Sequence, residues 1–329
     1  MKRFDLDYYL NGLKAENTVV LAQAITLIES KRRSDQDLGD LILTEILKEA
    51  EPSIRIGITG TPGVGKSSFI EGFGSFLISQ GKKVAVLAID PSSQRTGGSI
   101  LGDKTRMEML SKNPKAYIRP SASGSALGGV NNRTRESILL CEAAGFDAII
   151  VETVGVGQSE TLVNNMVDFF LLMIQPGSGD DLQGIKKGIM EMANGIVINK
   201  ADGDQAKLAK RSKTDLLSAL HLFAISDSGW QTQVELCSAL EHKGFDKVWS
   251  MISSFEKQMK GNGLFAQNRC SQNVTWFEDR VNLGLLQVLT SQPELTRLHQ
   301  QLKYKVQENE CSVSQATAEL LALARQLLA

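Results

Sequence analysis

The eight residues from Gly60 to Ser67 have the types and spacing needed to hold a phosphate group. They fit the pattern G-x-x-x-x-G-K-[ST] and follow the apolar run Ile54–Ile58. In such a loop the backbone N–H groups cradle a β-phosphate, the lysine reaches the β- and γ-phosphate oxygens, and the next hydroxyl can bind Mg²⁺. An ordinary glycine-rich turn is the alternative, but a helix-like pattern follows and favours a phosphate loop. The residues expected to bind nucleotide here are Gly60, Thr61, Pro62, Gly63, Val64, Gly65, Lys66, Ser67 and Ser68.

A second motif, N-K-x-D, indicates which base is bound. It comprises Asn199, Lys200 and Asp202 and closes an apolar run that begins at Gly195. The carboxylate of Asp202 can accept two hydrogen bonds from guanine N1 and N2, and adenine offers no such pair of donors. The motif is short enough to arise by chance, yet its place downstream of a phosphate loop and at a strand end favours GTP.

The stretch Cys237–Leu240 ends the next apolar run. A turn of small residues at that place would let the backbone contact the guanine O6, and a plain strand end is the alternative. The residues assigned to this contact are Ser238, Ala239 and Leu240.

Three carboxylates occupy places that suit a magnesium ion and a reacting water. Asp90 ends an apolar run and can hold Mg²⁺ directly or through water. Asp103 lies in a glycine-rich loop where a first switch segment would be, with a solvated loop aspartate as the alternative. Glu152 begins E-x-x-G where an ordinary GTPase has D-x-x-G, and it could orient a magnesium-bound water or the attacking water. We therefore expect the catalytic residues to be Lys66, Glu152 and Asp103.

The glycine of this E-x-x-G motif, Gly155, could sense the γ-phosphate through its N–H group. No glutamine follows it directly, although Gln158 is near. Slow intrinsic hydrolysis is therefore expected, with a partner needed to complete the site.

The stretch from Gly177 to Gly188 carries more charge than a connector needs. It follows an apolar run and is either a flexible surface loop or a third mobile segment that reports the nucleotide state to a partner. The residues expected to act there are Asp180, Asp181, Lys186 and Lys187.

The elements that must position these residues form a regular series. Short apolar runs alternate with helical stretches, and several runs are apolar without alternation, as in strands covered on both faces. This pattern predicts an α/β fold with a doubly wound, mostly parallel sheet of the P-loop NTPase type and helical extensions at both ends. The predicted strands lie within 54–60, 83–90, 116–122, 147–153, 168–175, 195–202 and 234–239.

Three segments are expected along the chain. Residues 1–50 carry apolar residues at helical spacing, 51–250 form the GTPase domain, and 251–329 form a C-terminal helical region for dimerisation. Within the last segment, Ser253–Asn273 is polar before helical patterns return, Pro293 breaks them, and Ser312 or Ser314 could cap the final helix.

Composition excludes several classes of function. The 329 residues have a formal net charge of −1, which gives no basic field for nucleic acid. The N-terminus lacks the apolar stretch of a signal peptide, and no run approaches the length of a membrane span. The four cysteines and three histidines show no metal-ligand spacing. A cytoplasmic protein with reduced thiols and no membrane association is expected.

Together the motifs resemble the MeaB/ArgK family of P-loop GTPases, which are metallochaperone GTPases related to hydrogenase and urease nickel-insertion proteins. The resemblance rests on motifs that run in order from Gly60 to Gly244: GTPGVGKSS, AIDPSS, GGSILGDKTRM, ETVGVGQSE, PGSGDDLQGIKKGI, NKAD and CSALEHKG. It implies a GTPase that escorts an adenosylcobalamin-dependent methylmalonyl-CoA mutase, gates cofactor loading and protects the mutase. It also implies a homodimer formed through the C-terminal helices.

The resemblance further assigns roles to individual residues. It places Lys66 on the phosphates of GTP or GDP and Asp202 on guanine, and it makes the 177–188 stretch a third switch in which Asp180 and Lys186 relay the nucleotide state. The residues that it places around Mg²⁺ are Ser67, Asp90, Asp103 and Glu152. A nucleotide-dependent kinase or ATPase linked to arginine and ornithine transport is the alternative. It ranks lower because the chain lacks a recognisable phosphoacceptor-binding signature.

Overall fold

The structure is a computed structural model that describes residues 3–48, 53–89, 107–120, 127–153, 159–177, 187–220 and 228–328. The chain divides into two compact units, Met1–Gln272 and Asn273–Ala329. The first unit holds the sheet and the motifs with the predicted site residues. The predicted boundaries near residues 50 and 250 stay a prediction.

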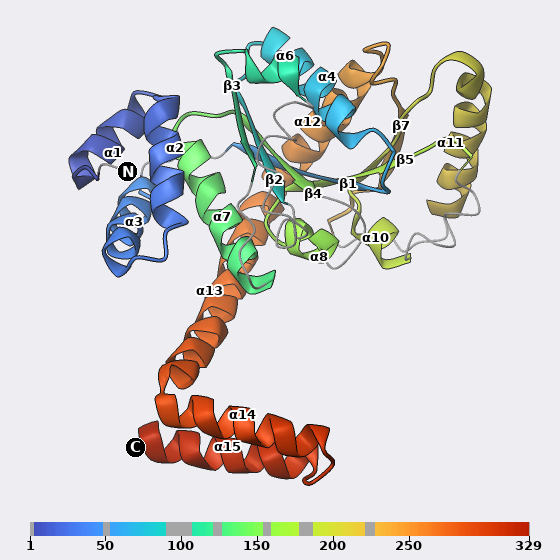
Figure 1. Ribbon diagram of the computed structural model, residues 1–329. Helices are drawn as coiled ribbons and strands as arrows, with labels where there is room; N and C mark the ends of the chain where they lie inside the picture. The colour runs from blue at the N-terminus through green and yellow to red at the C-terminus, as the bar shows by residue number, and fades with distance from the viewer. Residues whose placement is uncertain are drawn as a thin grey trace. The chain divides into compact units, whose positions relative to one another are not determined.

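The first unit is built on a seven-stranded sheet in which every strand pair is parallel (Figure 1). The strand order is β3-β2-β4-β1-β5-β6-β7, so β1 lies between β4 and β5, with Ile56 aligned to Ile150 and to Phe169. The predicted doubly wound parallel fold is confirmed. The strands are β1 (Ile54–Gly60), β2 (Val84–Ile89), β3 (Ala116–Pro120), β4 (Ala148–Thr153), β5 (Phe169–Ile174), β6 (Gly195–Ile198) and β7 (Gln233–Leu236).

Helices cover both faces of the sheet, as the unbroken apolar strands require. On one face, Phe69 and Phe73 of α4 (Lys66–Ser79) and Phe245 of α12 (Phe245–Gly261) are buried in a common core with β1. On the other face lie α7 (Leu127–Ala143), α8 (Ser159–Asn164) and α10 (Lys187–Met192), with α11 (Ala206–Leu220) beside β6 and β7 (Figure 1). Two short helices, α6 (Glu108–Ser111) and η1 (Gly203–Gln205), lie in the connections.

Three helices precede the first strand, as the apolar spacing predicts. They are α1 (Leu6–Lys14), α2 (Thr18–Ile28) and α3 (Arg33–Ile46), and they share a core with α7. Side chains cap the first two. Asp5 accepts a hydrogen bond from the Tyr8 N–H at 2.9 Å, and Asn17 accepts one from the Val19 N–H at 2.9 Å.

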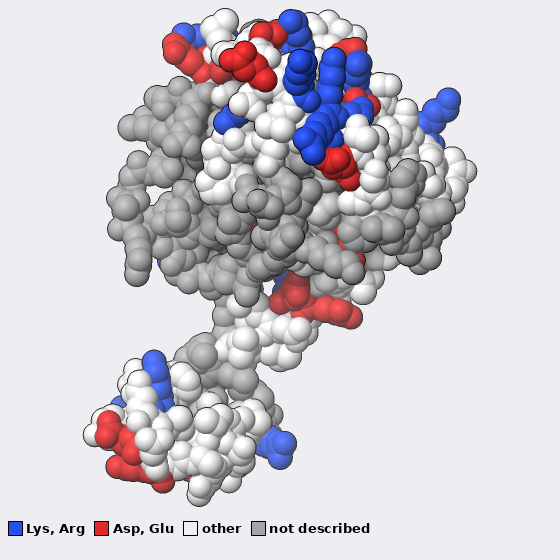
Figure 2. Space-filling model, turned by 90° about the vertical axis from the view of Figure 1, so that its right-hand side faces the viewer, with Lys and Arg blue, Asp and Glu red and all other residues white. Residues whose placement is uncertain are grey.

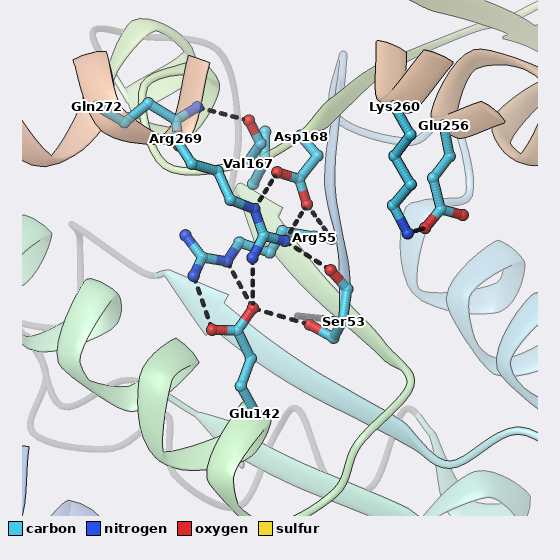
Figure 3. Close-up of polar contacts among 9 residues, drawn as sticks. All are labelled: Ser53, Arg55, Glu142, Val167, Asp168, Glu256, Lys260, Arg269 and Gln272. Atoms are coloured by element: carbon cyan, nitrogen blue, oxygen red, sulfur yellow. Dashed lines mark hydrogen bonds and ion pairs between the residues drawn. The ribbon is translucent and has the colours of Figure 1, made fainter. Parts of the chain in front are cut away.

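Helix α13 (Leu264–Ser291) begins on the first unit and is held there by buried ion pairs (Figure 3). Arg269 donates to the Asp168 carboxylate, with Nε–Oδ1 at 2.8 Å and Nη2–Oδ2 at 2.6 Å, and its Nη1 lies 3.2 Å from Glu142 Oε1. Arg55 donates to both Glu142 oxygens, at 2.9 and 2.7 Å. Since Asp168 precedes β5 and Arg55 is the second residue of β1, this cluster occupies the amino-terminal edge of the sheet.

The polar stretch 253–273, where the helical pattern lapses in the sequence, is helical almost throughout, within α12 and α13. Its helices bury few but large side chains, including Phe255, Met259 and Phe265. At Arg269 the helix contacts the first unit through ion pairs and not through an apolar side chain. The pattern is weak because these residues do not form a continuous apolar stripe.

The second unit contains the end of α13, then α14 (Pro293–Gln307) and α15 (Val313–Leu328), whose buried side chains include Leu295, Leu302 and Ala316. Pro293 starts α14, where a missing N–H costs nothing. The Ser312 hydroxyl accepts from the Gln315 N–H at 3.1 Å, so Ser312 is the cap of the final helix. Among the helices of the described ranges, none has the length and apolarity needed to cross a bilayer.

Candidate functional site

The phosphate-loop residues connect β1 to α4, at the carboxyl end of the central strand. Ligands of doubly wound sheets bind at this edge. Gly65 precedes α4 with φ at +92°, and a Cβ there would lie 2.8 Å from Asn199 Nδ2. The loop can therefore turn into the helix only with glycine at this position. Its N–H groups stand at a helix N-terminus, which attracts anions.

The Lys66 ammonium is held by the loop itself. Its Nζ donates to the carbonyl oxygen of Gly60 at 2.7 Å and to that of Thr61 at 3.4 Å. Burial lowers the pKa of Lys66 from its ordinary value, while the negative charges of Glu152 and Glu160 act in the opposite direction. An anionic phosphate beside the ammonium would favour its charged form and so offset the effect of burial on the pKa of Lys66.

Ser67 and Glu152 come together beneath the loop. The Ser67 hydroxyl donates to Glu152 Oε1 at 3.3 Å, and Glu152 is only 5% exposed at the end of β4. Mg²⁺ prefers oxygen ligands and in nucleotide sites takes only one or two from carboxylates, the rest from phosphates and water. This hydroxyl–carboxylate pair fits such an ion. Within the described ranges, no group of three or more His, Cys, Asp or Glu side chains could hold a metal by itself.

Two buried threonines fix the strand ends that carry these groups. Thr153 Oγ1 donates to Thr59 Oγ1 at 3.0 Å, and both side chains are essentially inaccessible to solvent. Thr59 precedes the phosphate loop and Thr153 follows Glu152. The bond therefore holds the loop and the carboxylate in register.

The N-K-x-D residues lie beside the phosphate loop and are bonded to it. Asn199 is buried; its Nδ2 donates to the Val64 carbonyl at 2.9 Å, and its Oδ1 accepts from the Ala239 N–H at 3.1 Å. Lys200, with φ at +58°, donates to the Gly63 carbonyl at 2.8 Å. The motif thus joins the phosphate loop to the Ser238–Leu240 turn.

The Asp202 carboxylate is oriented by Ser238, whose hydroxyl donates to Asp202 Oδ2. The Ser238 oxygen accepts in turn from the Glu241 N–H at 3.0 Å. The neighbouring thiol of Cys237 has its pKa raised to about 12, by burial first and then by the charges of Asp202 and Asp246. The Cys237 thiol is therefore neutral and adds no negative charge next to Asp202, where the guanine ring would bind.

The exit of β5 also reaches this site. Gln175 Oε1 accepts from Lys200 Nζ at 3.3 Å, and the Gly177 N–H donates to Ser212 Oγ on α11 at 3.0 Å. Neither Gln175 nor Ser212 has a sequence signal, because neither belongs to a spaced motif. The hydroxyl role of Ser238 and the burial of Glu160, which is 2% exposed, were likewise not predicted.

The structure brings together Lys66, Ser67 and Glu152, and it places Asn199, Lys200 and Asp202 beside Ser238 and Ala239. Leu240 is 82% exposed in the same turn. Lys187 begins α10. The remaining predicted site residues lie outside the described ranges: Asp90, Asp103, Gly155, Gln158, Asp180, Asp181 and Lys186.

Basic side chains gather near the site on α11. Lys207, Lys210 and Arg211 are exposed on its first turns. Figure 2, which looks at the side where α11 lies, shows Lys and Arg side chains grouped on the upper part of that face. Such a group favours the approach of an anionic ligand such as a nucleotide.

Comparisons with known proteins agree with this geometry. The family model described as "Methylmalonyl Co-A mutase-associated GTPase MeaB" matches residues 21–294. GTPase ArgK of Escherichia coli strain K12 is 47% identical over 303 residues, which are 92% of each chain. The mouse methylmalonic aciduria type A homolog, a mitochondrial protein, is 40% identical over 326 residues, covering 96% of this chain and 79% of the mouse protein. A crystal structure described as the LAO/AO transport system kinase matches with a TM-score of 0.77 at 37% identity and covers 99% of both chains.

Proposed function

The chain belongs to the MeaB family of methylmalonyl-CoA mutase-associated GTPases, and from this membership we propose that it binds and hydrolyses GTP as a chaperone of such a mutase. In this proposal the mutase depends on adenosylcobalamin, and the GTPase gates cofactor loading and protects the mutase. The observation that carries the nucleotide part is the set of bonds joining the N-K-x-D residues to the phosphate loop.

Guanine recognition would depend on Asp202. Its carboxylate accepts from Ser238 through Oδ2 and faces the turn that the Asn199–Ala239 bond holds in place. A carboxylate so fixed can accept from guanine N1 and N2 without first having to be oriented, and preorganisation of this kind lowers the cost of binding. ATP would leave the carboxylate without those donors.

Phosphate binding would redirect the Lys66 ammonium. It now donates to loop carbonyls, and a phosphate would offer it anionic oxygens at the same end of the loop. Ser67 and Glu152 would hold Mg²⁺, which when bound neutralises charge that develops on the β- and γ-phosphate oxygens.

Hydrolysis would proceed by attack of water on the γ-phosphorus, with the bond to the β–γ bridging oxygen breaking to release GDP and phosphate. Glu152 has two alternative roles in this step. It would orient either a magnesium-bound water or the water that attacks the γ-phosphorus. Asp103 is the other candidate for this step. Because no glutamine directly follows Gly155, we expect the unassisted rate to be low.

The partner part of the proposal is that a bound mutase completes the hydrolytic site through the 177–188 segment. Its charged residues, above all Asp180 and Lys186, would relay the nucleotide state. Coupling of this kind is reciprocal for binding: a mutase that favours one nucleotide state is favoured equally by that state. The mutase link comes from the family's description.

A homodimer and a cytoplasmic location are part of the same proposal. On α13 the side chains of Phe277, Val281 and Leu285 recur every four residues and are 68, 40 and 57% exposed. An apolar stripe of this size on a single chain supports contact with a second copy. The kinase alternative gains no support from the site, because the N-K-x-D strand end favours GTP over ATP.

The nucleotide part is tested by calorimetric titration of the full chain with GTP, GDP and ATP in the presence of Mg²⁺. We expect measurable binding of both guanine nucleotides and much weaker binding of ATP. Equal affinity for ATP and GTP would overturn the guanine assignment.

The partner part is tested by measuring GTP hydrolysis with and without a purified adenosylcobalamin-dependent methylmalonyl-CoA mutase. We expect stimulation by the mutase, and we expect Asp180→Ala and Lys186→Ala to reduce it while basal turnover stays nearly unchanged. Full stimulation in both variants would show that the 177–188 segment is only a connector.

A further inference from the structure

The first residues after β5 are attached to the helix that follows the guanine motif. Gly177 has φ at +77°, and its N–H donates to Ser212 Oγ on α11 at 3.0 Å. A Cβ at Gly177 would lie 2.8 Å from Leu208 Cδ2. The backbone of Gly177 therefore lies directly on α11, and its positive φ is a conformation that residues with side chains rarely adopt.

A second attachment lies two residues earlier. Gln175 Oε1 accepts from Lys200 Nζ at 3.3 Å, and the same ammonium donates to the Gly63 carbonyl at 2.8 Å. Lys200 thus connects the phosphate loop to the exit of β5. Its φ of +58° is unusual for a residue with a side chain, so these bonds help to hold a strained backbone.

Both attachments lead to the same structural unit. Lys200 follows β6, and Ser212 lies on α11, which begins after the short η1 helix that Asp202 precedes. The exit of β5 is therefore fixed at two points to the elements that would read guanine. The β5–β6 ladder ends at Ile174, so beyond it these side-chain bonds take over from the sheet.

We propose that Gln175 and Ser212 are positioning residues that make the chain leaving β5 respond to a bound guanine nucleotide. The inference rests on the proposed nucleotide site. Nucleotide binding at Asp202 and at the phosphate loop restrains Lys200 and α11, and the two attachments pass that restraint to Gln175–Gly177. The charged segment that would report to the mutase then starts from a point whose position depends on the nucleotide.

The test compares Ser212→Ala with Ser218→Ala in the full chain. Ser218 lies on the same helix, is exposed, and donates only within the helix, to the Thr214 carbonyl at 3.0 Å. Amide hydrogen exchange is measured in the peptide that contains Gln175–Gly177, with and without saturating GDP. We expect GDP to slow this exchange severalfold in the wild type and in Ser218→Ala, and to have little effect in Ser212→Ala. GDP affinity by calorimetry should agree within about twofold among the three.

A second pair of variants tests the Lys200 attachment. Gln175→Ala removes the acceptor and should lose the GDP response, while Gln175→Glu retains an acceptor for Lys200 and should keep it. If the GDP response depended only on the packing of the Gln175 side chain, and not on its bond to Lys200, the two variants would not differ in this way.

The outcomes separate this inference from the proposed function. A GDP response in Ser212→Ala equal to that of the wild type, or no response in a wild type that binds GDP, would overturn the inference alone. Failure of the wild type to bind GDP would overturn both. A normal GDP response together with no effect of the mutase on turnover would refute the proposed partner while the positioning role stands.

Discussion

Asp202 is the residue on which base selection would depend, and Ser238 already holds its carboxylate in place. We predict that Asp202→Asn weakens GTP binding by roughly 2–4 kcal/mol, because an amide cannot accept two charge-assisted bonds from guanine. Calorimetric titration with GTP measures the change. Asp204→Asn, two residues away on η1 and exposed, is the matched control and should bind normally. An unaltered affinity in Asp202→Asn would remove this carboxylate from the base site.

The Lys66 ammonium is partly buried and donates to the carbonyl oxygens of Gly60 and Thr61 in the phosphate loop. We predict that Lys66→Ala abolishes GTP hydrolysis and leaves the fold intact, because the lysine supplies a point charge to the transferred phosphate. Phosphate release under single-turnover conditions and circular dichroism provide the two readouts. Lys257→Ala, an exposed lysine on α12, should hydrolyse GTP at the wild-type rate. Near-normal turnover in Lys66→Ala would refute the phosphate-loop assignment.

At this scale the sequence predicts residues that belong to spaced motifs and misses those that support them. Lys66, Glu152 and Asp202 follow or end predicted strands, and the parallel sheet brings those ends to one edge. Gln175 and the Ser212 hydroxyl reach the same region only through the fold. Their contacts depend on where α11 lies against the exit of β5, and no local pattern specifies that position.

At the scale of the elements, Arg269 is one of the residues that attach the start of α13 to the sheet. Arg269 bonds to Asp168 and Glu142, whose side chains are each 3% exposed. We predict that Arg269→Ala lowers the free energy of unfolding by about 3–5 kcal/mol, since it leaves buried carboxylates without part of their compensation. Urea unfolding followed by circular dichroism measures the loss. Arg297→Ala, an exposed arginine on α14, should change stability by less than about 0.5 kcal/mol.

A small effect of Arg269→Ala would show that Arg55 alone compensates Glu142 and that Asp168 is satisfied by the Arg55 N–H, which donates to it at 2.8 Å.

The same cluster shows which elements a sequence pattern does not predict. All seven predicted strands are present because each is a compact apolar run. The start of α13 was not predicted because its buried face combines a single large apolar side chain, Phe265, with the ion pairs of Arg269, and hydrophobic spacing does not register such a face.

For the whole molecule, the exposed stripe on α13 gives a prediction about assembly. Phe277→Asp should convert a dimer to a monomer while helix content is retained, because a buried charge without a partner opposes association. Light scattering coupled to size exclusion measures the mass. Glu278→Gln alters the adjacent exposed position and should leave the mass unchanged. A dimeric Phe277→Asp variant would place the contact between copies elsewhere.

The strand order has a consequence for how the chain acquires its structure during synthesis. Strand β1 pairs only with β4 and β5, which follow it by about a hundred residues, whereas β2 pairs with β3 and β4. Such non-local pairing is slow, because loop closure must precede the contacts that reward it. A nascent chain that has reached residue 120 already contains the whole phosphate loop, yet neither neighbour of its strand has been made. Until β4 is complete at residue 153, an apolar β1 has no partner strand, and in that interval the protein depends most on protection from aggregation.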